Sequence, residues 1–131
     1  RWGGGIVLVT IVVTAAQGGR LWIFDLAPRR LVVAVPIVLL MAAFNAFNEE
    51  FVFRGAPLTE LTDVLGKHHA LVLMGYVFGI SHYYGTPSGV PALAMGVFLG
   101  WFLGKSMLET EGIGYAWGVH VLLDVVVFTS Y

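Results

Sequence analysis

The sequence predicts an all-α protein that is integral to the membrane, a polytopic bundle of about four full helical spans plus a truncated N-terminal one. Of the 131 residues, 58% are hydrophobic and only 11% are charged. The mean hydropathy is +0.85. A soluble domain carries roughly 25% charged residues, so composition alone indicates a protein whose solvent is the lipid bilayer.

Five apolar blocks predict the helices, at about 3–16, 31–54, 70–86, 90–108 and 113–130. Crossing the hydrocarbon takes about 20 helical residues. The first block is too short and is expected to be the end of a truncated span. Pro36 can start or kink the second helix, and the Gly- and Pro-rich segment 85–91 predicts a turn. No linker or repeat interrupts the chain, so we expect one domain over 1–131.

The charges indicate the orientation and narrow the possible partners. Loop 17–30 carries Arg20, Arg29 and Arg30 against Asp25 alone, and an excess of basic residues predicts the cytoplasmic side of the membrane. The net charge of −1 argues against a nucleic-acid partner. The absence of cysteine excludes disulfides and thiolate nucleophiles.

Three charged residues, Glu49, Glu50 and Arg54, follow a long uncharged stretch. Placing such a group in mid-bilayer costs about 2.5–3.5 kcal/mol. A protein accepts this cost when the group is paired, faces a water-filled cavity or takes part in a reaction. Glu50 and Arg54 are four apart and can pair on one helical face, whereas Glu49 points about 100° away. We therefore expect Glu49 to be the catalytic carboxylate and the pair of Glu50 and Arg54 to be structural. Asn45, one turn before Glu49 on the same face, could donate a hydrogen bond to it. A juxtamembrane charge cluster is the alternative.

Two more polar islands occur in apolar surroundings. His82 follows Phe78 by four residues, and Asp124 follows His120 by four, so each pair shares a helical face. His82 could help Glu49 to deprotonate water, or it could be an interfacial histidine. His120 and Asp124 could present hydrogen-bond donors to a developing oxyanion. Alternatively, Asp124 could simply accept a hydrogen bond from the His120 imidazole.

Other uses of the histidines are also open. His68 and His69 stand beside Lys67 and are expected to be solvated in a loop. Glutamate and histidine are zinc ligands, so Glu49, His82 and His120 form an alternative metal set. The usual zincin motif is absent, and no cofactor is predicted.

The three islands together carry a resemblance to a known family. Glu49-Glu50-x-x-x-Arg54, Phe78-x-x-x-His82 and His120-x-x-x-Asp124 resemble the signature of the CPBP family. This family contains CAAX proteases and bacteriocin-processing enzymes and is also called the Abi family. Its eukaryotic relative is the type II CAAX prenyl protease. The resemblance extends over about 45–124, within an expected protease-like core at about 31–131.

The resemblance implies an intramembrane glutamate endopeptidase that works without a metal. Glu49, assisted by His82, would activate a water molecule, and His120 with Asp124 would stabilise the oxyanion. The charge pair after Glu49 would hold the site together. The implied substrates are prenylated CAAX-type tails or other membrane-associated peptides, presented at the bilayer.

One position departs from the family pattern. The last motif often ends in asparagine, which can donate to an oxyanion, whereas an ionised aspartate can only accept. Asp124 would therefore be protonated, or would orient His120, or would leave the oxyanion to His120 alone. A non-catalytic scaffold or bacteriocin immunity factor of the same fold is the alternative function. A metal-dependent hydrolase or an ion-coupled transporter is a third.

Overall fold

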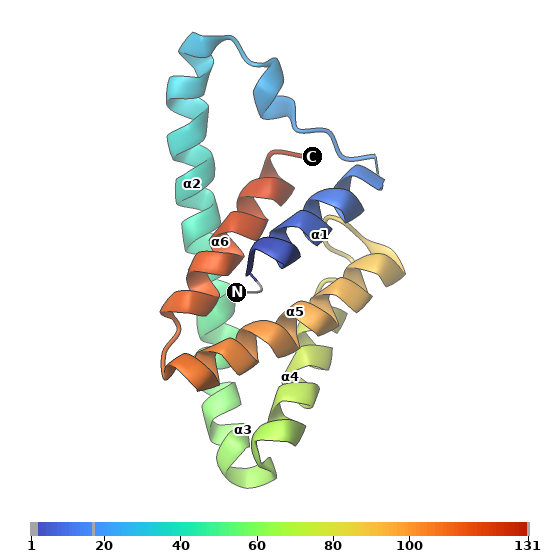
Figure 1. The fold of residues 1–131 in the computed structure, drawn as a ribbon, viewed down its shortest axis with the longest axis vertical. Helices are drawn as coiled ribbons and strands as arrows, with labels where there is room; N and C mark the ends of the chain where they lie inside the picture. The colour runs from blue at the N-terminus through green and yellow to red at the C-terminus, as the bar shows by residue number, and fades with distance from the viewer. Residues whose placement is uncertain (1–2, 17, 131) are drawn as a thin grey trace. The chain divides into compact units, whose positions relative to one another are not determined.

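The computed structural model describes residues 3–16 and 18–130, and every regular element among them is helical (Figure 1). The predicted all-α class is thereby confirmed. The elements are α1 (Gly3–Ala16), the 3-10 turn η1 (Trp22–Asp25), α2 (Pro28–Glu50), the π-helical turn η2 (Phe51–Gly55), α3 (Pro57–Leu65), α4 (Lys67–Ser81), α5 (Gly89–Thr110) and α6 (Gly114–Phe128).

Two described stretches are long and apolar enough to cross a membrane. One is Pro28–Leu65, which runs through α2, η2 and α3, and the other is Gly89–Thr110, which is α5. The apolar helices Gly4–Ala16 and Gly114–Phe128 are shorter than a full span. The predicted count of about four full spans is therefore not confirmed by helix length and composition.

Helix boundaries differ from the prediction in several places. Helix α2 begins at Pro28, a residue suited to the first helical turn, so Pro36 lies inside the helix and does not start it. His68 and His69 are exposed as expected, but they lie in the first turn of α4 and not in a loop. Gly66, at φ +77°, separates α3 from α4, and the helix resumes directly after it. The turn predicted at 85–91 lies three residues earlier, at 82–88, between α4 and α5.

The described chain separates into two compact units, formed by residues 1–46 with 119–131 and by residues 47–118. The expectation of one domain over 1–131 stays a prediction. So does the cytoplasmic side of loop 17–30, in which Gln17 lies outside the described residues.

In the first unit, the segment after α1 caps the end of α6. The last carbonyls of a helix have no partner within it. The Arg20 N–H donates to the Ser130 carbonyl at 3.0 Å, and the Trp22 N–H donates to the Thr129 carbonyl at 2.9 Å. The Trp22 indole N–H donates to the Phe128 carbonyl at 3.1 Å. These bonds satisfy polar groups that would be costly to leave unpaired in lipid.

In the second unit, glycines bring the backbones of α4 and α5 into contact. A Cβ atom placed on Gly96 would lie 2.8 Å from the Cα of Gly79, and one on Gly100 would lie 2.9 Å from the Cα of Gly75. Small residues at such crossings are typical of membrane helix pairs, because they let dispersion contacts form between backbones. This packing holds the end of α4, and with it His82, in a fixed place within the unit.

We expect Gly79→Ala to lower the free energy of unfolding by about 1–3 kcal/mol, the usual cost of overpacking. The added Cβ would lie 2.4 Å from the Val97 Cγ2 and 2.7 Å from the Leu93 carbonyl oxygen. Gly118→Ala is the control, because its Cβ meets nothing within 4 Å and alanine favours a helix. Thermal unfolding in detergent measures both, and equal melting temperatures would contradict the close approach of α4 and α5.

Candidate active site

A buried ion pair follows directly after Glu49. Glu50 is 0% exposed and Arg54 is 1% exposed, and Arg54 Nη1 donates a hydrogen bond to Glu50 Oε1. The Arg54 guanidinium also lies over the ring of Phe78, 4.4 Å from its centroid, where the ring face attracts a cation. The spacing of four residues predicted this pair. Its complete burial shows that both side chains belong to the interior of the second unit.

The pair lies at a change of helical geometry that the sequence did not reveal. Helix α2 ends at Glu50 and passes into the π-helical turn η2. Such turns are rare and frequently occur at functional sites. Within η2, Phe53 packs edge-on against Phe78, with ring centroids 5.1 Å apart and planes at 87°. Phe78 thus supports the turn as well as the arginine.

The end of α4 fixes the orientation of His82. The His82 backbone N–H bonds to the Gly79 carbonyl, and His82 Nδ1 lies 2.8 Å from the Phe78 carbonyl oxygen. A carbonyl oxygen can only accept, so Nδ1 carries the hydrogen. The Ser81 hydroxyl, which the sequence did not single out for this role, donates to the same carbonyl at 2.7 Å. The imidazole also packs on the Phe78 ring, with centroids 4.3 Å apart.

Glu49 and His82 face one another across the two helices. Glu49 Oε2 lies 3.6 Å from His82 Nε2, and both side chains are partly exposed, 25% and 34% respectively. With its hydrogen on Nδ1, the neutral imidazole presents Nε2 as an acceptor. A carboxylate and an imidazole acceptor at this distance can share the two hydrogens of one water molecule. General-base catalysis needs a proton acceptor within hydrogen-bond reach of the attacking water, and Glu49 is the candidate for that role.

A second polar group lies in the unit formed by residues 1–46 and 119–131. Asp124 Oδ2 accepts a hydrogen bond from Asn45 Nδ2 at 3.1 Å, and Asp124 Oδ1 lies 3.6 Å from His120 Nε2. His120 is 5% exposed and Asp124 is 8% exposed. The aspartate therefore lies between an amide and an imidazole. The sequence predicted the histidine as its neighbour but not the asparagine, which is 79 residues away in the chain.

The predicted site residues thus form two groups of contacting side chains, one in each unit. The first group is Glu49, Glu50, Arg54, Phe78 and His82, and the second is Asn45, His120 and Asp124. Within the described part of the chain, no cluster of three or more His, Cys, Asp or Glu side chains is placed to hold a metal ion. The alternative zinc set of Glu49, His82 and His120 draws on both groups.

Residues 31–126 match the family described as type II CAAX prenyl endopeptidase, Rce1-like. The chain belongs to this family. The resemblance inferred from the three motifs is confirmed, and both groups of polar residues lie inside the matched range. Members of the family are intramembrane proteases, and the chain is accordingly a membrane protein. No curated protein and no solved structure matches the chain.

Proposed function

We propose that the protein is an intramembrane endopeptidase that hydrolyses a peptide bond with a water molecule activated by Glu49. The single observation that carries this proposal is the pairing of Glu49 with an oriented His82, 3.6 Å apart, in a chain of the CAAX prenyl endopeptidase family. Phe78 packs against the His82 imidazole and against the Arg54 guanidinium, which pairs with Glu50 next to Glu49.

In the proposed reaction Glu49 is the general base. Its carboxylate takes one proton from water, while His82 Nε2 accepts a hydrogen bond from the other. The resulting hydroxide attacks the scissile carbonyl carbon, and the carbonyl oxygen becomes an oxyanion. Collapse of this intermediate breaks the C–N bond, and the proton held by Glu49 passes to the departing amine, so that the site returns to its initial state. Such proton transfer contributes about 10²- to 10⁴-fold to a rate.

The family resemblance assigns the second group to the same reaction, with His120 as the donor to the oxyanion. An ionised Asp124 can only accept, and it already accepts the Asn45 amide hydrogen. This contact favours one of the three roles considered for it, that of orienting His120 and compensating positive charge on the ring. A donor held in this way needs little reorganisation as the oxyanion forms.

The proposed substrates are membrane-associated peptides, with prenylated CAAX-type C-terminal tails as the first candidates. A prenyl chain places its peptide at the bilayer, where the apolar helices of the protein lie. The proposed chemistry uses Glu49, His82 and His120 as proton acceptors and donors, and the hydrolysis that we propose proceeds without a metal.

The test is cleavage of C-terminal peptides by the purified protein in detergent, with a chelator present. Matched peptides with and without a prenyl group are incubated with the protein, and mass spectrometry identifies the products. We expect a shortened peptide from the prenylated member of a pair. No product from any peptide, or product only after a divalent metal is added back, would contradict the proposal.

A further inference from the structure

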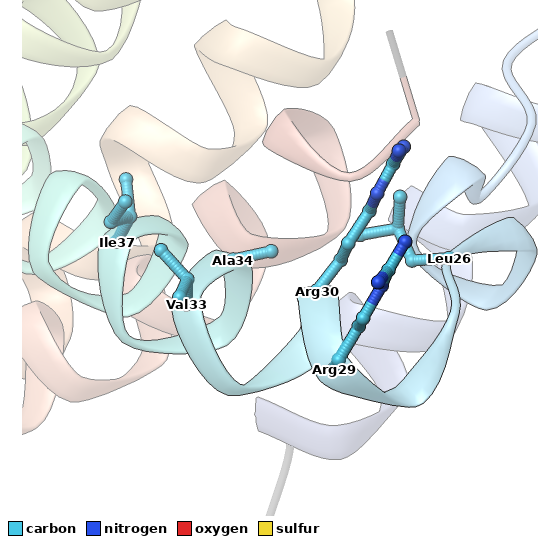
Figure 2. Close-up of a pocket in the computed structure, with 6 residues that line it drawn as sticks. All are labelled: Leu26, Arg29, Arg30, Val33, Ala34 and Ile37. Atoms are coloured by element: carbon cyan, nitrogen blue, oxygen red, sulfur yellow. The ribbon is translucent and has the colours of Figure 1, made fainter.

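A groove runs along the beginning of α2, far along the chain from the catalytic candidates. Its volume is about 570 Å³. Figure 2 shows the residues that line it, which are Leu26, Arg29, Arg30, Val33, Ala34 and Ile37.

The lining has a charged end and an apolar length. Arg29, Val33 and Ile37 are spaced by four and therefore form one row along the helix, and Arg30 begins the next row. Figure 2 shows both guanidinium groups reaching the same way from the first turn of α2. Val33 is 61% exposed and Ile37 is 51% exposed. A ligand that fits this groove has an anionic head and an apolar chain.

The two arginines are available to such a head. Within the described residues neither of them forms an ion pair or a side-chain hydrogen bond. Arg20, by contrast, is bonded to Asp25 at 3.1 Å, and Lys105 lies 3.7 Å from Glu109. The groove therefore carries two positive charges that no residue described by the structure neutralises.

We infer that this groove binds one anionic glycerophospholipid, with its phosphate between Arg29 and Arg30 and an acyl chain along Val33 and Ile37. A guanidinium fork matches the oxygens of a phosphate and gives bidentate hydrogen bonds. The two arginines lie at the beginning of an apolar stretch long enough to cross the membrane. The end of such a stretch lies where the lipid headgroups meet the hydrocarbon. An anionic lipid neutralises the two charges better than a zwitterionic one, whose own cation competes for the phosphate. The inference is independent of the proposed catalysis.

The test is a lipid titration of the full chain in detergent, followed by native mass spectrometry. The probes are phosphatidylglycerol and phosphatidylcholine with identical acyl chains. We expect phosphatidylglycerol to bind more tightly, and Arg29→Gln/Arg30→Gln to weaken it about 30-fold, since each basic residue near the lipid contributes about a fivefold preference. Lys67→Gln/Lys105→Gln removes the same charge elsewhere and is expected to leave the affinity unchanged.

Two further arms distinguish a bound lipid from a free phosphate ester and from attraction to overall charge. Glycerophosphoglycerol has the same headgroup without acyl chains, and we expect it to compete only weakly. Equal binding of this soluble anion would show a phosphate site and overturn the lipid assignment. An equal loss of affinity in both double variants would show attraction to overall charge, and an unchanged affinity in Arg29→Gln/Arg30→Gln would show that the groove is not the site.

Discussion

Replacing Glu49 by Gln is expected to lower kcat for peptide cleavage by about 10³-fold while leaving the fold intact. The amide has the shape of the carboxylate but cannot take a proton from water, and general-base catalysis is worth about 10²- to 10⁴-fold. The Glu49 side chain is 25% exposed, and the nearby buried Arg54 keeps Glu50 as its partner, so we expect little loss of stability. Steady-state cleavage of the best peptide substrate measures the effect.

Glu60→Gln is the matched control for this substitution. Glu60 is an exposed acidic residue of α3 in the same unit, and its loss changes the net charge equally. We expect this control to retain wild-type kcat and wild-type melting temperature. A Glu49→Gln protein that keeps most of its activity would contradict the assignment of Glu49 as the base. One that melts well below the control would give Glu49 a structural role instead.

Arg54→Gln is expected to lower the free energy of unfolding by about 3–5 kcal/mol. Removing one partner of a buried ion pair leaves the other charge buried and uncompensated, and Glu50 is 0% exposed. The substitution also removes the cation from the face of the Phe78 ring. Unfolding in detergent, followed by circular dichroism, measures the loss.

Two comparisons make this prediction specific to the buried pair. Lys105→Gln breaks an exposed pair of the same spacing, with Glu109, and is expected to cost less than about 1 kcal/mol. Glu50→Gln/Arg54→Gln removes both charges and should cost less than Arg54→Gln alone. An Arg54→Gln protein as stable as the Lys105→Gln protein would show that the pair does not stabilise the unit.

Local spacing explains why part of the candidate site could be predicted from the sequence. The pairs Glu50 with Arg54 and His120 with Asp124 each lie one helical turn apart, so a helix brings them together whatever the rest of the chain does. The all-α class followed equally directly from the apolar composition. Neither prediction required knowledge of tertiary contacts.

The remaining contacts depend on packing that no local pattern encodes. Glu49 meets His82 because α4 packs against η2, the turn that follows α2. The bond from Asn45 to Asp124 joins residues 79 apart in the chain. The π-helical turn η2 and the resumption of the helix at Lys67 were not predicted from the sequence. The count of spans also depends on helix lengths, which hydropathy defines only to within several residues.

Hydrolysis of a prenylated peptide in water enriched in oxygen-18, with chelator present, tests the central claim most directly. With the wild-type protein we predict a shortened peptide whose new C-terminal carboxylate carries one heavy oxygen from the first turnover onward. The Glu49 side chain should remain unlabelled, and the Glu49→Gln protein should give almost no product. Heavy oxygen in the Glu49 carboxylate would show direct attack by that group, and equal product from both proteins would contradict a water molecule activated by Glu49.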